Sequence, residues 1–237
     1  MKPGTAFFVL LLSGLLAGCA SPSEERAVNA VAELYGGQVK LSKGSGISTD
    51  GKKLQGSFLG ITLESPGLAQ RYDDLQLPAS NCALLVYQGL TGNEHERYDY
   101  YKITVADSSS SHSYSFARAE VAQAAQAAGL LTTIMANMQQ EDYAAAARTL
   151  HPIALQGLSP DSVTALLAKV GRGLAPLRDY DLHGYKIVSE QVSGQPLELV
   201  QLYLSVPATP ESRRLLVVIN PQAEASTPFL YGFNLLD

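Results

Sequence analysis

Side chains that could do chemistry concentrate in the C-terminal third of the chain. Polar or aromatic residues stand two apart in several segments there: Asp181, His183 and Tyr185, then Gln201 and Tyr203, then Tyr231 and Phe233. Residues two apart share one face of an extended strand, so each group could face one cavity. General acid–base catalysis in that cavity would need a His or a carboxylate with a shifted pKa, beside a hydrogen-bond donor. Asp181 follows Arg178 and Asp179, where an exposed carboxylate is the ordinary outcome, so no catalytic residue is assigned from the sequence.

A second cluster of titratable side chains lies at residues 93–101, NEHERYDYY. Its carboxylates and His95 are side chains of the types that bind metal ions, which suggests a metal site. Alternate residues of a strand face opposite ways, however, and Glu94 to Glu96 read as a loop after Gly92, so no fixed ligand geometry follows. The other histidines stand alone, and the chain has no zinc motif, phosphate loop, nucleophile elbow or cysteine pair. We therefore expect neither a metal nor a cofactor.

The N-terminus carries the sharpest chemical signal. Lys2 precedes an uncharged run of apolar and small residues, which ends at Cys19. A permanent membrane-spanning helix needs about 18 or more apolar residues, and this run is shorter and is interrupted at Ser13. Residues 1–18 are therefore predicted to be a signal peptide for export rather than a membrane anchor.

Leu16-Ala17-Gly18-Cys19 resembles the lipobox of bacterial lipoproteins, in which the cysteine thiol is acylated and becomes the mature N-terminus. The resemblance implies that Cys19 carries several acyl chains and that residues 19–23 form a lipidated tether. One chain binds a membrane only marginally, at about 0.8 kcal/mol per buried methylene, whereas several chains attach a protein stably. Ala20 in place of Asp implies sorting to the periplasmic face of the outer membrane. The alternative is a chance cysteine in an ordinary signal peptide.

Length and composition bound the fold and the partners of the chain. Removal of residues 1–18 leaves 219 of the 237 residues, enough for one large or two small domains. The chain is 46% hydrophobic and 16% charged, which allows a sizeable core. Its formal net charge is −5 and it has no stripe of Lys and Arg, so it lacks the electrostatic footprint of nucleic-acid binding. Once Cys19 is lipidated, Cys82 in SNCALLVYQG is the remaining thiol, and we expect it to be buried and structural.

Residues 24–118 are predicted to form one α+β domain with the order helix, strand, strand, helix, strand, strand. Helical spacing covers 24–35 and 79–90, and extended segments follow each helix. The stretches AVNAVAELYGG and ASNCALLVYQG align at a constant offset of 52 residues, which suggests an internal duplication. A duplication predicts two helices side by side on one antiparallel four-stranded sheet, related by a pseudo-twofold axis.

An Ala- and Gln-rich stretch at 119–129 is predicted to be a helical connector to a second domain, residues 130–237. Apolar positions predict helices over LLTTIMANMQQ and EDYAAAARTLHP, with a break between them. A further helix begins with Ser159 as its N-cap and ends at Gly171. Four extended segments follow on hairpin-scale connections, so we expect helices packed on a four-stranded antiparallel sheet.

This order of helices and strands, with QEDYAAAARTLHP near its start and LYGFNL at its end, resembles the nuclear-transport-factor-two-like, or cystatin-like, α+β superfamily. The resemblance covers residues 130–237 and implies a cone, in which a curved sheet folds around helices and leaves a concave pocket. The candidate ligand-pocket residues are then Tyr143, His183, Tyr185, Gln201, Tyr203, Tyr231 and Phe233. An apolar cavity with a few polar tips suits a small molecule. The alternative is that these aromatic side chains are core and rim residues with their hydroxyls in water.

Two functions fit these observations. The one we favour from the sequence is a non-catalytic, lipid-anchored module of the cell envelope, which meets the membrane through its N-terminal lipid and binds an envelope protein or a small apolar ligand. Tethering raises the effective concentration of such a module beside its partners. The alternative is a small-molecule enzyme of the cone fold that uses His, Asp or Tyr side chains in the pocket. A cone filled with Leu, Val and Phe would disfavour the enzyme.

Overall fold

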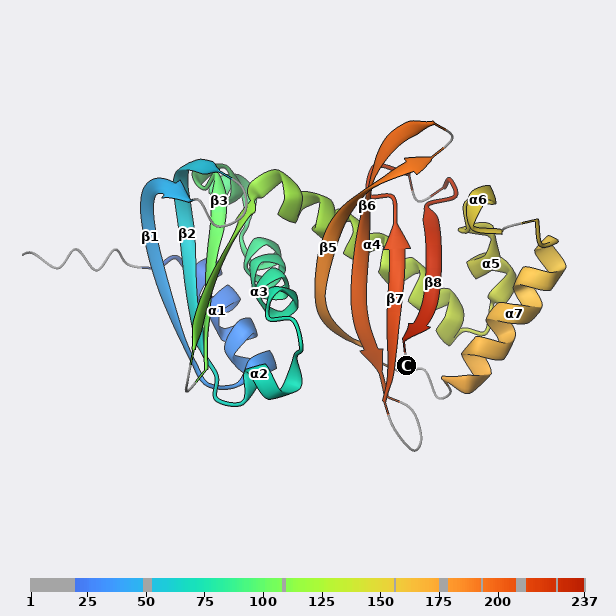
Figure 1. The fold of residues 1–237 in the computed structure, drawn as a ribbon, viewed down its shortest axis with the longest axis horizontal. Helices are drawn as coiled ribbons and strands as arrows, with labels where there is room; N and C mark the ends of the chain where they lie inside the picture. The colour runs from blue at the N-terminus through green and yellow to red at the C-terminus, as the bar shows by residue number, and fades with distance from the viewer. Residues whose placement is uncertain are drawn as a thin grey trace, which may run out of the picture.

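Two α+β lobes make up the chain, and each is built on one four-stranded sheet (Figure 1). This computed structural model describes residues 20–48, 53–107, 110–155, 157–174, 179–192, 194–207, 212–224 and 226–236. The predicted α+β class with two small domains is confirmed. The predicted signal peptide, residues 1–18, and the predicted lipidation site, Cys19, lie outside the described residues.

The N-terminal lobe is a sheet with helices packed on one face. Its elements are α1 (Pro22–Tyr35), β1 (Gln38–Ser48), β2 (Leu54–Glu64), α2 (Leu68–Arg71), α3 (Gln76–Gly89), the short 3-10 helix η1 (Gly92–Arg97), β3 (Tyr100–Ala106) and β4 (Ser111–Ala117). The strands lie in the order β1-β2-β3-β4. α1 and α3 are so close that a Cβ on Gly89 would press on Ala27. Cys82 of α3 is fully buried, which confirms its prediction as a buried thiol.

The central strand pair of this sheet differs from the antiparallel prediction. β2 and β3 run parallel, with Phe58 opposite Tyr100, whereas β1–β2 and β3–β4 are antiparallel. The physical reason is the connection, because α3 carries the chain back across the sheet and a helical crossover joins parallel neighbours. A twofold axis that kept both helices on one face would make the two inner strands antiparallel. The predicted pseudo-twofold relation is therefore wrong.

The first helix is fixed to its sheet at the end nearest to Cys19. Ser21 Oγ accepts a hydrogen bond from the Glu24 N–H, and Glu24 Oε2 accepts one from the Ser21 N–H at 2.7 Å. The buried Glu24 carboxylate also accepts from Tyr98 Oη at 2.6 Å and pairs with Lys43 at 2.6 Å. Burial raises the pKa of Glu24, but the hydrogen bonds from Lys43 and Tyr98 outweigh it and lower that pKa. The start of α1 is therefore held in a network of satisfied polar groups.

The C-terminal lobe is an antiparallel sheet with helices packed against it. Its elements are α4 (Arg118–Gln139), α5 (Tyr143–Arg148), α6 (Pro152–Leu155), α7 (Pro160–Gly173), β5 (Asp181–Val192), β6 (Gln195–Val206), β7 (Arg213–Ile219) and β8 (Leu230–Leu236). The strand order is β5-β6-β7-β8 and every pair is antiparallel, as predicted. The predicted connector, 119–129, is the first half of α4, which continues without a break to Gln139. One helix thus runs from the first lobe across the second (Figure 1).

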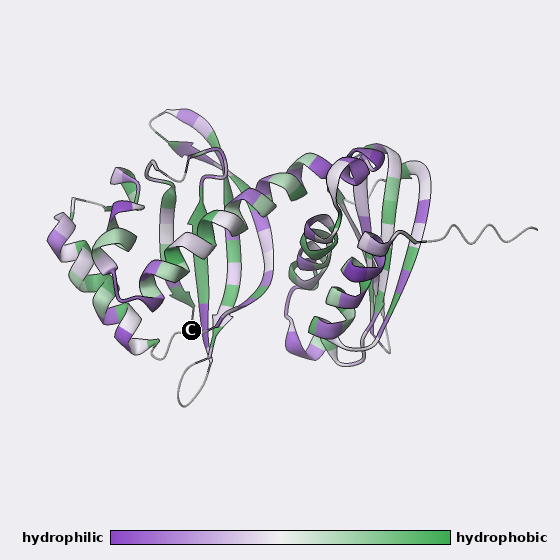
Figure 2. Cartoon of the chain, turned by 180° about the vertical axis from the view of Figure 1, so that it is seen from behind, coloured by the Kyte–Doolittle hydropathy of each residue, from purple (hydrophilic) through white to green (hydrophobic). Residues whose placement is uncertain are grey.

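The side of this sheet that faces α4 is filled with apolar side chains. From Val200 to the end of β6, every second residue is at most 1% exposed: Val200, Leu202, Leu204 and Val206. α4 contributes side chains that are at most 2% exposed: Leu131, Ile134, Met135 and Met138. Figure 2, the view from behind, shows α4 crossing in front of these strands. The space in which the resemblance implied a ligand pocket is therefore packed with hydrophobic core.

Candidate functional site

The two lobes meet where α3 lies against β5, an edge strand of the C-terminal sheet. Ser80 Oγ of α3 accepts a hydrogen bond from the Tyr185 N–H at 2.8 Å, and Asn81 Nδ2 donates to the Leu182 carbonyl at 2.7 Å. Gly184 lies between these two bonds at a β-bulge, and a Cβ there would overlap the carbonyl oxygen of Leu77. A helix therefore covers the strand edge that another strand would otherwise pair with, and it orients one lobe against the other.

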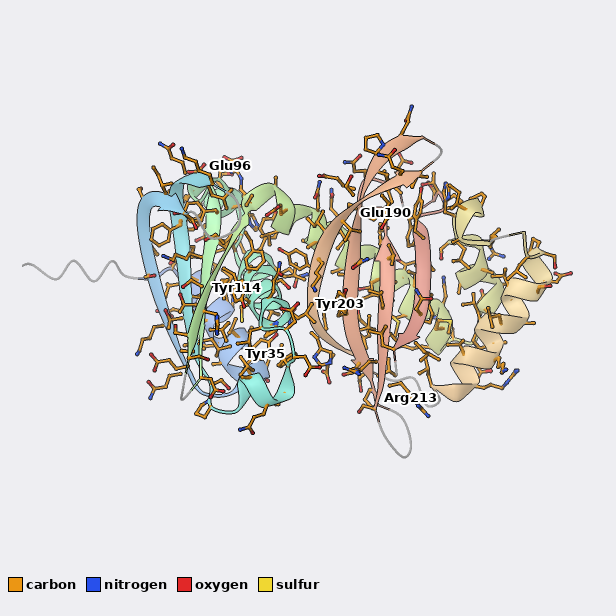
Figure 3. The ribbon with its side chains drawn as sticks, in the orientation of Figure 1. Tyr35, Glu96, Tyr114, Glu190, Tyr203 and Arg213 are labelled. Atoms are coloured by element: carbon orange, nitrogen blue, oxygen red, sulfur yellow. The ribbon has the colours of Figure 1, made fainter. Side chains whose placement is uncertain are left out.

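A recess of about 200 Å³ opens beside this contact. Its polar lining comes from both lobes: Arg71, Tyr72, Asp73 and Asp74 from the corner between α2 and α3, and His183, Tyr203 and Arg214 from the C-terminal sheet. Tyr72 Oη and His183 Nδ1 are 3.0 Å apart, and their rings meet edge-on with centroids 5.5 Å apart. Figure 3 labels Tyr203 on the part of the sheet next to the N-terminal lobe. We call this space the interlobe recess.

The Tyr72–His183 pair is held in its neutral form. Burial lowers the pKa of His183, the Asp181 carboxylate acts against that change, and the Arg214 guanidinium reinforces it. Burial also raises the pKa of Tyr72. At neutral pH the imidazole and the phenol therefore offer hydrogen bonds to a ligand without a net charge of their own.

Charged side chains around the recess have protein partners. Lys186 Nζ contacts Asp74 Oδ2 at 2.8 Å across the lobe boundary. Burial acts to raise the pKa of Asp74, but the hydrogen bonds from Lys186 and from the Gln76 N–H outweigh it and lower that pKa. Arg71 Nη2 donates to the Tyr35 carbonyl at 3.2 Å, close to the C-terminus of α1. These contacts fix the walls of the recess, which Leu77, Leu204, Leu215 and Leu236 also line.

Only part of the predicted pocket belongs to this recess. His183 and Tyr203 line it, and Tyr203 Oη donates to Gln201 Oε1 at 3.0 Å on the face of the sheet opposite to α4. Tyr185 lies on the other face, 3% exposed, with its ring 6.1 Å from that of Phe116. Its hydroxyl has no hydrogen-bond partner among the described residues. The bulge at Gly184 shifts the register within β5, so His183 and Tyr185 do not share a face as strict alternation predicted.

The remaining predicted residues lie on the far side of the C-terminal lobe. Tyr143 of α5 packs on α7, where a Cβ on Gly171 would overlap its ring. Tyr231 of β8 stacks on His151, with centroids 4.4 Å apart and an interplanar angle of 12°. Phe233 lies farther along β8, beside a surface groove. The structure thus does not gather the candidates in one cavity: His183 and Tyr203 line the recess, Tyr185 is in the core, and Tyr231 and Phe233 line this groove.

This groove separates β8 from α7, and we call it the β8–α7 groove. It consists of two adjoining hollows of about 400 and 450 Å³, which share Leu166 in their linings. The lining of the first is mostly apolar: Leu150, Ile153, Ala154, Leu155, Leu158, Val163, Leu166, Leu167, Tyr231, Gly232, Phe233 and Asn234. The second adds Val170, Leu174, Leu235 and Leu236 together with two cations, Lys169 and Arg213. Figure 3 labels Arg213 at the end of the sheet near this hollow.

The acidic cluster at 93–101 has structural partners. Glu94 Oε2 accepts hydrogen bonds from Ser23 Oγ at 2.5 Å and from the Thr91 N–H at 3.0 Å, and these bonds lower the pKa of Glu94 to about 2. Asp99 Oδ2 accepts from the Ser57 N–H at 2.7 Å. Over the described ranges, no three His, Cys, Asp or Glu side chains gather as metal ligands.

Sequence reasoning missed the residues that complete both surfaces. Arg71, Tyr72 and Asp74 come from RYDD, a segment in which no site was predicted, although an aromatic residue among charges in a short loop is a usable signal. In the α7 segment, Leu166 directly precedes the buried Leu167. Consecutive leucines on a helix place apolar side chains outside the core-facing stripe, which signals a second apolar surface.

Comparison with protein-family models, with curated protein sequences and with solved structures finds no match to this chain. Within the part of the chain that the structure describes, none of the helices is both long and apolar enough to cross a membrane. A function must therefore be inferred from the residues and their geometry.

Proposed function

We propose that this chain is an exported, non-catalytic binding module of the bacterial cell envelope, attached by a lipid on Cys19 to the periplasmic face of the outer membrane. The motif at 16–19 supports the anchor. Because α1 begins at Pro22, only Ala20 and Ser21 separate the lipidated residue from the folded body. At about 3.5 Å per extended residue, the N-terminal lobe would lie roughly 10 Å from the lipid.

The interlobe recess is the proposed ligand site. The observation that carries the proposal is the convergence of Tyr72, His183, Tyr203 and two arginines from separate lobes on one recess of about 200 Å³. Ligand sites occur preferentially at domain interfaces, and sites for drug-sized molecules begin at roughly 300 Å³. This smaller recess, which Leu77, Leu204, Leu215 and Leu236 line together with the polar side chains, fits a small molecule that is partly apolar and that accepts or donates hydrogen bonds.

Metabolic labelling and fractionation test the anchor. Cells that express the full chain are labelled with radioactive palmitate and separated into soluble and membrane fractions. We expect label on the protein and its recovery with outer membranes, and we expect Cys19→Ser to lose both. Cys82→Ser is the matched control and should keep both. Unlabelled protein, or protein recovered in the cytosol, would contradict the proposal.

A fragment screen tests the ligand site. The chain from Ala20 onward contains every described helix and strand, so it can be labelled with ¹⁵N and titrated with a set of small polar fragments. We expect the amide shifts to cluster around residues 71–77 and 183–186 and to disappear in Tyr72→Phe combined with His183→Gln. Fragments that bind only elsewhere on the surface would contradict the choice of this recess.

A small-molecule enzyme is a second candidate because His183 and Tyr72 are within hydrogen-bond distance, 3.0 Å, at the edge of a recess. Such a pair could relay a proton to or from a bound substrate. The fragment or co-purifying molecule that occupies the recess distinguishes the candidates. If the chain is a binding module, mass spectrometry after incubation should find this molecule unchanged. If the chain is an enzyme, mass spectrometry should detect a product, and His183→Gln should abolish its formation.

A further inference from the structure

The C-terminal sheet has two edges, and the described residues cover one of them more fully than the other. α3 covers the β5 edge through Ser80 and Asn81. At the other edge, the Leu230 N–H donates to the Thr149 carbonyl at 2.9 Å, and the His151 N–H donates to the Leu230 carbonyl at 2.8 Å. Beyond Leu230, the described residues offer the backbone of β8 no hydrogen-bond partner other than β7. Alternate N–H and C=O groups of β8 therefore face the β8–α7 groove unpaired.

The walls of the groove expose an unusual share of the molecule's large apolar side chains. Six large apolar residues are substantially exposed in the described part of the chain, and four of them lie here: Ile153 at 48%, Leu158 at 48%, Leu166 at 51% and Leu235 at 49%. Figure 2 shows apolar positions along α7. Single exposed leucines are ordinary, but a contiguous apolar patch beside a free strand edge marks an interaction surface.

Charge distinguishes one end of the groove from the other. Lys169 of α7 and Arg213 of β7 line the hollow at the C-terminal end of β8. No salt bridge within the described residues involves either of them. Two unpaired cations next to an apolar floor are complementary to a ligand with an apolar body and an anionic end.

We propose that an extended segment of a partner protein adds to the free edge of β8 as a further strand and places a carboxylate beside Lys169 and Arg213. Its backbone pairs with β8, and its alternate side chains enter the apolar groove. The part of β8 beyond Leu230, residues 231–236, spans roughly 20 Å, which matches a bound strand of about six residues. Of its lining residues, this interaction surface shares Leu236 with the interlobe recess, and the proposal does not depend on the ligand proposed there.

A strand fits this groove better than a hydrocarbon chain does. An acyl chain would satisfy the apolar walls and its carboxylate could reach the cations. It would also cover the unpaired N–H and C=O groups of β8 without replacing their hydrogen bonds to water, and burial of an unpaired backbone group is unfavourable. A second strand satisfies the same groups directly.

Fluorescence anisotropy tests the proposal with two synthetic peptides and the chain from Ala20 onward. Both peptides contain a six-residue segment of alternating Val and Thr. One peptide has two Glu residues after this segment, at its C-terminus, and the other has two Glu residues before it, at its N-terminus. The variants are Leu166→Glu for the apolar wall and Lys169→Glu for the cationic end. Leu34→Glu and Arg26→Glu, at exposed positions on α1, are matched controls, and circular dichroism checks that every variant is folded.

We expect one of the two peptides to bind with a Kd of about 10–100 μM. Leu166→Glu should weaken binding at least about tenfold, because it places a charge against the apolar side of the strand. Lys169→Glu should weaken it about fivefold, and the loss should shrink in high salt. Binding should also slow hydrogen exchange at amides of residues 231–236, and the α1 controls should bind as the unaltered chain does.

Several results would overturn the proposal. One is that neither peptide binds at concentrations up to about 1 mM. Another is equal binding by Leu166→Glu and Leu34→Glu, because the groove would then not be the site. Palmitate that binds the groove and excludes the peptide would show a lipid site, and a dimer in sedimentation velocity that Leu166→Glu dissociates would show that a second copy occupies the edge.

Discussion

The backbone of β5 at Gly184 passes close to the backbone of α3, and a single added carbon there should separate the two elements. A Cβ at this position would overlap the carbonyl group of Leu77 and lie 2.7 Å from Ser80 Oγ. The Leu77 carbonyl belongs to the backbone of a helix and cannot rotate aside as a flexible side chain could. Gly184→Ala must therefore push β5 away from α3.

The expected loss of stability follows from the contacts that this movement breaks. The hydrogen bonds from the Tyr185 N–H to Ser80 and from Asn81 to the Leu182 carbonyl each contribute about 1 kcal/mol. Overpacking of a close contact costs a further 1–3 kcal/mol, roughly. Alanine has less conformational entropy than glycine in the unfolded chain, and this difference stabilises the folded state by about 0.5–1 kcal/mol. We expect Gly184→Ala to lower the free energy of unfolding by about 3 kcal/mol, and more if both lobes lose their mutual support.

Urea denaturation of the chain from Ala20 onward, followed by circular dichroism and tyrosine fluorescence, measures this change. Gly129→Ala is the matched control, because Gly129 lies within α4 and a Cβ there meets no atom within 4 Å. The control should raise the free energy of unfolding by about 0.5–1 kcal/mol, since alanine is the better helix former. If Gly184→Ala stays within about 0.5 kcal/mol of the unaltered chain, the close approach of α3 and β5 does not exist in solution.

Three further predictions concern the recess and the core. Burial lowers the pKa of His183 below its value of about 6.5 in the unfolded chain. As the pH falls, the unfolded chain therefore binds a proton at this imidazole before the folded chain does. The contribution of neutral His183 to the free energy of unfolding is full above about pH 6.5 and is lost as the pH falls below that value. His183→Gln should flatten that loss in urea denaturation between about pH 7.5 and 5, whereas His112→Gln, at an exposed position, should leave it unchanged. Burial raises the pKa of the Cys82 thiol, so a thiol reagent at pH 8 should not modify the folded chain. The same reagent should modify Cys82 after denaturation in about 6 M guanidinium, and rapid reaction of the folded chain would contradict the buried position of this thiol. Leu131→Ala should lower the free energy of unfolding by about 3 kcal/mol because Leu131 is fully buried between α4 and the sheet. Leu158→Ala, at a 48% exposed position, should lower it by less than about 1 kcal/mol, and equal losses would show that the C-terminal lobe is not packed as described.

Local sequence patterns predicted the elements of the fold well. The helical spacing that ends at Tyr35 corresponds to α1, Ser159 is the N-cap of α7 as expected, and four extended segments became β5 to β8 in the predicted order. Such signals act over a few residues, through capping groups, turns and the periodicity of apolar side chains.

The site could not be predicted in the same way because its residues meet across the fold. Tyr72 and His183 are 111 positions apart and contact each other only because α3 covers β5. The β-bulge at Gly184 then shifts the side chains of β5, so strict alternation misassigned the faces of His183 and Tyr185. A parallel β2–β3 pair was likewise missed, since strand direction depends on how α3 crosses the sheet.

By itself, the sequence determined the class of the fold, the order and approximate ends of its helices and strands, and the acidic character that disfavours nucleic acid as a partner. Those properties depend on backbone preferences and on periodic burial, which each segment carries locally. The tertiary structure alone decided that the interior of the C-terminal lobe is filled, that a recess lies between the lobes, and that the described residues leave an edge of β8 free beside exposed leucines. These features arise from contacts between distant segments, and no pattern within one segment records which surface another segment will cover.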